Sequence, residues 1–302
     1  MTARDRYRTA AAFRAALEQR LRTEGQATGV PLNRLRKEAA FHRLLARLHR
    51  AAPDLWALKG GQALIARLGI EVRATKDADA NWRATRHELE EALTAVEDLD
   101  LDDWFTFQIG DAHSLPGEGD HGALRYSVIA SLDGRAFEHL SLDINIVGPN
   151  DVRPVEIVRT RRNPFAFVDE LPLEIPMVPP AQQLAEKLHA YTRLYQDEQT
   201  SSRAKDLFDM VVIADQVELP NVDALTAATR QTFQLRKTAW PPELQHPPQE
   251  WARPWAGFIA DYPLPYDDLD SAFTALQQFW MPILTATSAT EANWRPDVWK
   301  WS

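Results

Sequence analysis

Asp77 and Asp79 form an Asp-x-Asp pair, a spacing that can bind a metal ion. In an extended segment alternate side chains point to the same side, so these two carboxylates face the same way. Neighbouring carboxylates repel each other unless a cation lies between them. A small set of oxygen ligands suits Mg²⁺, which keeps water and substrate phosphates in its other positions. The pair therefore indicates a magnesium site, although an Asp-x-Asp pair taken alone more often belongs to a solvated loop.

A third carboxylate, Asp143, lies in a segment where apolar and polar residues alternate, between Leu142 and Ile144. Alternation of period two predicts a strand. A charged side chain in such surroundings is costly to bury without a partner, and a metal shared with Asp77 and Asp79 would supply one. Three carboxylates can hold two ions about 3.5–4 Å apart, one at an attacking hydroxyl and one at a leaving pyrophosphate. In this arrangement Asp143 binds the ion at the nucleophile and can accept its proton.

A glycine turn, Lys59-Gly60-Gly61, precedes a short helical segment over residues 62–68. Two glycines before a helix let backbone N–H groups approach a phosphate closely, at the positive end of the helix dipole. A Gly-Gly pair alone usually marks nothing more than a turn. Followed by the paired aspartates and by Asp143, it indicates a site where a phosphate is bound beside metal-binding carboxylates.

Hydrophobic periodicity predicts the helices and strands that carry these residues. Helical spacing is found over residues 6–23, 33–50, 62–68, 85–98, 180–195, 203–217, 222–236 and 268–286. Strand patterns are found over residues 55–58, 77–80, 104–109, 124–131 and 137–147. Prolines between residues 164 and 180 indicate a linker. The sequence therefore predicts an α/β (α+β) fold, with a mixed β-sheet flanked by helices over residues 1–160 and a helical C-terminal lobe over residues 161–302.

Composition excludes several classes of protein. The 302 residues include no cysteine, which excludes disulfides, thiolate catalysis and cysteine-bound zinc. No apolar run approaches the roughly 20 residues of a transmembrane helix, and the first residues lack the apolar core of a secretory signal. We therefore expect no membrane association and a cytoplasmic location.

Charge and aromatic residues are unevenly distributed. Residues 1–50 contain 12 Lys and Arg against four Asp and Glu, in a chain whose net charge is −9. These two basic helices could hold a polyanion, or their arginines could lie on solvated faces or pair with the acidic body. Residues 240–302 contain seven of the ten tryptophans and many prolines. Those tryptophans could stack on nucleic-acid bases, but packing of the tail onto the helical lobe is the favoured interpretation.

The motifs also resemble those of a known family. Lys59-Gly60-Gly61, an apolar helix and Arg73-Ala74-Thr75-Lys76-Asp77-Ala78-Asp79 resemble the signature of the DNA polymerase β-like nucleotidyltransferase superfamily. More narrowly, they resemble the AbiEii/AbiGii toxin family, which includes the mycobacterial MenT toxins. Two later segments are similar to helices of that family: Glu186-Lys187-Leu188-His189-Ala190 and Arg203-Ala204-Lys205-Asp206-Leu207-Phe208-Asp209. The four motifs occur in the family's order between about residue 57 and residue 215.

The resemblance implies roles for further residues. Lys187 would hold the triphosphate, Asp209 would orient the NTP or Lys187, and Thr75 matches a hydroxyl that is phosphorylated in some members. Arg203, Lys205 and Asp206 would belong to the nucleotide site together with Lys59, Gly60 and Gly61. Spacing alone leaves alternatives open: Lys205 and Asp209 are four residues apart and could form a helix-surface pair. Lys187, near an apolar helix face, could equally extend to water.

The resemblance also implies an activity. Such proteins are toxins of type IV-like toxin–antitoxin or abortive-infection systems, and some MenT toxins add pyrimidine nucleotides to the 3′ CCA end of tRNA. We therefore expect a Mg²⁺-dependent nucleotidyltransferase, with two ions, that transfers NMP from a pyrimidine NTP to an RNA, the tRNA 3′ end being favoured. A cognate antitoxin would be a protein partner. The alternatives are transfer to a protein or small molecule, and a catalytically silent NTP-binding module.

Overall fold

The computed structural model describes residues 2–69, 75, 77–115, 123–192, 203–286 and 291–302. The chain forms two compact units, residues 1–178 and residues 179–302. The first contains a mixed β-sheet with helices and the second is mainly helical, which confirms the predicted fold class. The sequence places the end of the first lobe near residue 160, whereas the unit observed here continues through one further strand to Val178.

The described part of the first unit contains an eight-stranded sheet. Its strands are β1 (Trp56–Lys59), β2 (Asp77–Trp82), β3 (Phe105–Ile109), β4 (His113–Leu115), β5 (Ala123–Leu132), β6 (Arg135–Ile146), β7 (Glu156–Arg159) and β8 (Glu174–Met177). Their order is β3-β5-β6-β2-β1-β8-β7, with β4 beside β5. Strand β2 runs parallel to β6, and β1 runs parallel to β8. Strand β8 lies in the stretch that its prolines predict to be a linker. Pro176 is within the strand, and a proline argues against a strand in sequence analysis.

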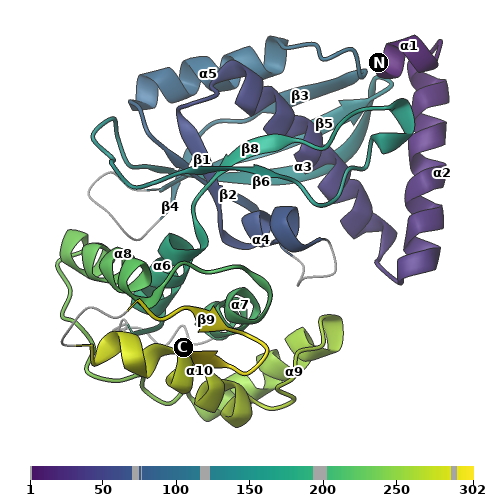
Figure 1. Ribbon diagram of the computed structural model, residues 1–302. Coiled ribbons are helices and arrows are strands. Elements are labelled where there is room, and N and C mark those ends of the chain that lie inside the picture. The colour runs from purple at the N-terminus through teal and green to yellow at the C-terminus, as the bar shows by residue number, and fades with distance from the viewer. Residues whose placement is uncertain (1, 70–74, 76, 116–122, 193–202, 287–290) are drawn as a thin grey trace. The chain divides into compact units, whose positions relative to one another are not determined.

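Five helices of the first unit are described: α1 (Ala3–Arg6), α2 (Ala10–Thr28), α3 (Leu32–Ala51), α4 (Gly60–Leu68) and α5 (Arg86–Asp98). Helices α3 and α5 lie over one face of the sheet, and α4 lies against the other (Figure 1). Alternation within β2 directs Ala78, Ala80 and Trp82 into the buried core, where residues of α3 such as Leu44 and Leu48 also lie. The remaining side chains of β2 therefore point to the face on which α4 begins.

A buried ionic group fixes α3 to the segment that precedes β3. Asp103 is 2% exposed and accepts hydrogen bonds from Arg47 Nη1 and Nη2 at 3.0 and 2.6 Å. Arg43 adds a bond to the same carboxylate at 3.3 Å and two bonds to Glu170. Both arginines are 1% exposed, so this part of the basic N-terminal region pairs with acidic residues of its own unit.

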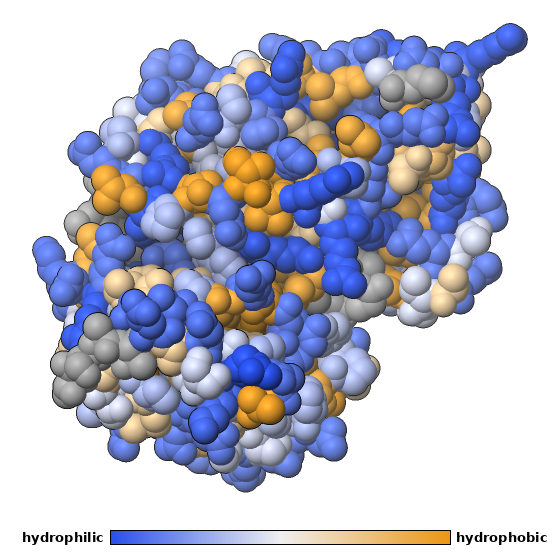
Figure 2. All heavy atoms as spheres, in the orientation of Figure 1, coloured by the Kyte–Doolittle hydropathy of each residue, from blue (hydrophilic) through white to orange (hydrophobic). Residues whose placement is uncertain are grey.

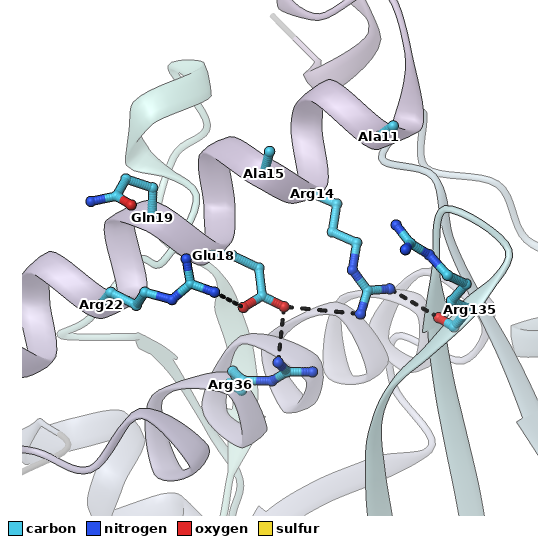
Figure 3. A pocket seen from close by; sticks show the side chains of 8 residues that line it. All are labelled: Ala11, Arg14, Ala15, Glu18, Gln19, Arg22, Arg36 and Arg135. Atoms are coloured by element: carbon cyan, nitrogen blue, oxygen red, sulfur yellow. Dashed lines mark hydrogen bonds and ion pairs between the residues drawn. The ribbon is translucent and has the colours of Figure 1, made fainter.

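A second ionic group ties α2 and α3 to the turn between β5 and β6. Glu18 lies among Arg14, Arg22 and Arg36, which line an open pocket of about 530 Å³ together with Arg135 (Figure 3). Arg36 donates to Glu18 at 2.9 Å and to the carbonyl of Phe137, and Arg14 donates to the carbonyls of Leu132, Arg135 and Ala136. The guanidinium groups of Arg14 and Arg36 therefore serve as structural clamps, and those of Arg22 and Arg135 are exposed.

A buried hydrogen bond joins α3 to the first turn of α4. Gln62 Nε2 donates to Glu38 Oε2 at 2.7 Å, and the two side chains are 3% and 8% exposed. Burial raises the pKa of Glu38 to about 7, against the lowering effect of the Gln62 hydrogen bond and of nearby basic residues. Because Gln62 directly follows Gly60 and Gly61, this contact fixes the position of the glycine turn.

The described residues of the second unit form helices α6 (Pro180–Thr192), α7 (Arg203–Gln216), α8 (Val222–Leu235), α9 (Ala252–Asp261) and α10 (Leu269–Leu284). Two short strands follow, β9 (Trp294–Arg295) and β10 (Lys300–Trp301), and 3₁₀ turns cover Ala166–Val168 in the first unit and Gln249–Trp251 in the second. The indole N–H groups of Trp294, Trp299 and Trp301 donate to the carbonyls of Ala214, Ala275 and Phe279. These contacts support packing of the tail rather than base stacking.

The face of the molecule drawn in Figure 2 is predominantly hydrophilic, with hydrophobic side chains in small groups. Large apolar side chains that are exposed in the described chain are Val152, Ile157, Leu171, Leu235 and Val298. None of the described helices combines the length and apolar character that crossing a bilayer requires.

Replacing Asp103 with Ala is expected to lower the free energy of unfolding by about 3–5 kcal/mol, because Arg43 and Arg47 would keep buried charges without their shared carboxylate. Asp100→Ala is the matched control: its carboxylate is 52% exposed and pairs with Arg4, so its loss should cost less than about 1 kcal/mol. Urea denaturation of the full chain checks both values. Equal effects of the two substitutions would contradict the role assigned to the buried group.

Glu38→Gln is expected to remove a pH dependence of stability. Between pH 4.5 and about 7 the folded chain holds a proton on Glu38 that the unfolded chain has released, so stability falls as pH rises through this window. The loss of unfolding free energy is on the order of 3 kcal/mol once the pH is above about 7. Below pH 4.5 there is no loss.

The difference in unfolding free energy between Glu38→Gln and wild type should therefore grow from pH 4.5 to 7 and then stay constant. Taking this difference removes the contribution of His42, whose pKa burial lowers in both proteins. A difference that does not change with pH would contradict the assignment.

Candidate active site

The three predicted carboxylates lie on one face of the sheet. In the parallel pairing of β2 with β6, Asp79 is opposite Asp143 and Asp77 is opposite Ser141. Residues in register on adjacent strands point to the same side, and the intervening residues Ala78 and Leu142 are buried on the other side. Strand pairing therefore brings together side chains that are more than 60 positions apart in the sequence.

Gly60 lies directly against this carboxylate face. Its φ is +66°, in the left-handed region that favours glycine. A Cβ atom built on Gly60 would lie 2.6 Å from Asp79 Oδ2, so any larger residue would displace that carboxylate. Gly61 follows as a buried residue of the first turn of α4. The glycine turn is therefore positioned beside Asp79, as a phosphate site next to a metal-binding carboxylate requires.

Arg125 is a member of the site that the sequence analysis missed. Its Nε and Nη2 donate to Asp143 Oδ1 and Oδ2 at 2.7 and 2.6 Å, and Nη2 also reaches Asp77 Oδ2 at 3.3 Å. Hydrogen bonding to Asp143 and the charges of Asp77 and Asp79 raise the pKa of Arg125 above its usual value. The polar alternation of β5 marks Arg125 as facing away from the core, but the sequence does not reveal its register opposite Asp143.

The donor set fits a hard divalent cation in type. Three carboxylates face one side, the Gly60 backbone lies close against Asp79, and a positive group already lies between Asp77 and Asp143. In the described residues that group is the Arg125 guanidinium, and no cluster of three carboxylate or imidazole groups is arranged around an open metal position. A divalent ion at these carboxylates would take over the neutralising contacts that Arg125 now makes.

Two further residues of the predicted site lie beside this carboxylate face. Lys59 of β1 lies opposite Asp79 of β2 in the antiparallel register, which places the two side chains on the same side of the sheet. Thr75 Oγ1 donates to the carbonyl of Asp77 at 3.2 Å, so it lies immediately before the carboxylate strand. Arg73, Ala74 and Lys76 of the predicted motif lie outside the described residues.

The second unit holds a separate charged cluster formed by α6 and α7. Lys187 Nζ donates to Asp209 Oδ2 at 2.6 Å and to Asp206 Oδ1 at 3.4 Å. Asp209 is fully buried, and the side chain of Lys187 is 11% exposed. Asp206 and Asp209 lie three residues apart and so share the face of α7 that meets Lys187. A buried carboxylate thus holds the lysine amine in place.

The remaining predicted residues of α7 lie beside this cluster in the sequence. Lys205 is exposed, and the surface pair with Asp209 that the spacing allowed does not form, because Asp209 is buried against Lys187. Arg203 is the first residue of α7, and its side chain lies outside the described part of the structure. The structure therefore brings Lys187, Asp206 and Asp209 together and leaves Lys205 apart from them.

In chemical terms, the two clusters are complementary. The first unit offers carboxylate oxygens next to a glycine turn, which suits a divalent cation and a phosphate. The second offers a fixed ammonium group, which suits a phosphate as a point charge.

One solved structure shows the same fold. The nucleotidyltransferase toxin MenT4 from Mycobacterium tuberculosis H37Rv is 16% identical, with a TM-score of 0.54 over 93% of this chain and 92% of that chain. JHP933 from Helicobacter pylori is 18% identical, with a TM-score of 0.43 over 82% of this chain and 94% of that chain. At such identities the similarity to MenT4 shows the fold alone. No curated protein matches the chain.

A family model described as "Nucleotidyl transferase AbiEii toxin, Type IV TA system" matches residues 43–278. The matched region contains the glycine turn, the three carboxylates and the charged cluster of α6 and α7. Because the match spans most of the 302 residues, the chain belongs to the AbiEii family of nucleotidyltransferase toxins of type IV toxin–antitoxin systems.

Proposed function

We propose that this nucleotidyltransferase uses Mg²⁺ to transfer NMP from an NTP to the 3′ end of an RNA, with tRNA as the acceptor. The observation that carries the proposal is the convergence of Asp77, Asp79 and Asp143 on one face beside Gly60. A set of three carboxylates next to a phosphate-binding turn supports in-line displacement at a nucleotide phosphate.

In this proposal Asp77, Asp79 and Asp143 would hold two metal ions. When bound, the ions polarise the phosphate and stabilise the charge on the leaving pyrophosphate. Asp143 orients the acceptor hydroxyl and takes its proton. The backbone of Gly60 and Gly61, at the N-terminus of α4, binds phosphate oxygens, and Lys59 contributes a positive charge on the same face.

The cluster in the second unit would bind the triphosphate. Lys187 supplies the positive charge, and Asp209 holds its amine in a fixed position because the carboxylate is buried and bonded to it. Asp206 adds a second, weaker contact. We assign Arg203 and Lys205 to the outer part of this nucleotide site, and Thr75 to a position where phosphorylation would add negative charge beside Asp77.

The finer parts of the proposal rest on the family resemblance. They are a preference for pyrimidine NTPs, tRNA as the acceptor, a cytoplasmic place of action and neutralisation by a cognate antitoxin. Exposed arginines such as Arg22 and Arg135 are available to RNA phosphates, whereas Arg43 and Arg47 are buried and are not.

Asp77→Asn is expected to reduce nucleotide transfer by at least about 100-fold, because it removes a charge that the transition state needs at the phosphate. The assay incubates the full chain with each α-labelled NTP, Mg²⁺ and total RNA, and follows label on separated RNA and protein. Asp54→Asn, an exposed aspartate of the same unit, is the matched control and should keep full activity.

Label on a tRNA-sized band with wild type and Asp54→Asn, but not with Asp77→Asn, is the expected result. Label on protein would redirect the proposal to a protein acceptor, and transfer by Asp77→Asn at the wild-type rate would overturn the assigned site.

Lys187→Met is expected to weaken NTP binding about tenfold or more and also to destabilise the second unit, since the buried Asp209 would lose its hydrogen bond from the Lys187 ammonium. The double variant Lys187→Met/Asp209→Asn also removes the buried negative charge and should regain stability without regaining NTP affinity. Lys300→Met is the matched control, because Lys300 is an exposed lysine of the second unit that has no role in the proposed site. Titration calorimetry and thermal unfolding measure the two effects. Recovery of NTP affinity in the double variant would show that Lys187 acts only in folding.

A further inference from the structure

The Arg125 guanidinium occupies a specific position among the three carboxylates. It forms a fork with both oxygens of Asp143, at 2.7 and 2.6 Å, and a third contact with Asp77 at 3.3 Å. The side chain of Asp143 is 12% exposed, so its charge has little access to water and depends on this partner. Forked pairs of this kind are the stronger charge-assisted hydrogen bonds of proteins.

The same guanidinium is also exposed enough to move away from the carboxylates. The side chain of Arg125 is 41% exposed, whereas the structural arginines Arg43 and Arg47 are 1% exposed. Arg125 comes from β5, opposite Asp143 on β6, and within the described part of the chain its hydrogen bonds go to Asp143 and Asp77, which the proposed reaction uses. A long side chain on a strand surface can turn toward solvent without moving the backbone.

We infer that Arg125 is a tethered counter-ion that competes with the divalent metal for Asp143 and Asp77. This inference rests on the proposed function, since it takes those carboxylates as the metal site. Without metal, Arg125 neutralises the carboxylates and prevents their mutual repulsion. When metal binds, Arg125 gives up those contacts and its guanidinium turns outward, where it is free to pair with a phosphate of the nucleotide or RNA.

Competition has a measurable consequence. Every contact that Arg125 makes with Asp143 and Asp77 must be broken for metal to bind, so the contacts lower the apparent metal affinity of the free protein. By linkage, bound metal must weaken the hold of the carboxylates on Arg125 to the same degree. A purely structural arginine would show the opposite behaviour, because its removal would disorder the carboxylates and weaken metal binding.

The test measures Mn²⁺ binding to the full chain, without nucleotide, by electron paramagnetic resonance of free Mn²⁺. Arg125→Gln is expected to bind Mn²⁺ on the order of tenfold more tightly than wild type. Arg135→Gln, at the start of β6, is the matched control: it removes an equal charge from an exposed arginine that pairs with Asp133, and should leave the affinity unchanged. Arg125→Lys keeps the charge without the fork and should lie between wild type and Arg125→Gln.

Equal or weaker Mn²⁺ binding by Arg125→Gln would overturn the inference while leaving the metal site in place. If Asp77→Asn binds Mn²⁺ as wild type does, the ion is not at these carboxylates and the proposed function fails with the inference. A second measurement needs no variant: Mn²⁺ should increase the rate at which phenylglyoxal modifies Arg125 in the wild-type chain, as located by peptide mass spectrometry. An unchanged or reduced rate would contradict displacement.

Discussion

The parallel pairing of β2 with β6 is the constraint on which the rest of the site depends. It sets Asp79 opposite Asp143 and places Asp77 on the same face, so three like charges lie together on one surface. Such an arrangement is unfavourable unless positive charge compensates it. Arg125 on the neighbouring strand supplies that charge in the structure, and the Gly60 turn approaches closely enough to leave no room for a side chain. The geometry of the sheet thus requires a compensating positive charge, which a bound metal ion would also supply.

In the second unit, a buried carboxylate is compensated by a lysine. There a carboxylate, Asp209, is fully buried and would be costly alone, and Lys187 compensates it. The pair costs desolvation but holds a flexible lysine in one position, which a phosphate-binding amine requires. Both units therefore hold charged side chains in position through an ionic partner rather than through packing alone.

Much of this architecture is predictable from local patterns. Alternation in 140–146 identified β6 and placed Asp143 within it, and the Asp-x-Asp pair defined β2, because period two is visible in a single strand. Pairing between strands is not visible in this way, so Arg125 was missed although its own strand was found. Strand β8 was missed because it contains Pro176, and a proline argues against a strand. Spacing also could not decide which lysine, Lys187 or Lys205, pairs with Asp209. Long-range register and burial decided each of these cases.

The division of the chain at Val178 has a genetic consequence. Every strand of the large sheet precedes this point, and the lysine cluster follows it. A nonsense or frameshift mutation shortly after codon 178 would therefore leave the sequence of the carboxylate-bearing unit complete while deleting the cluster that includes Lys187. Under the role proposed for Lys187, such truncations are an accessible route by which a toxin gene would lose its activity.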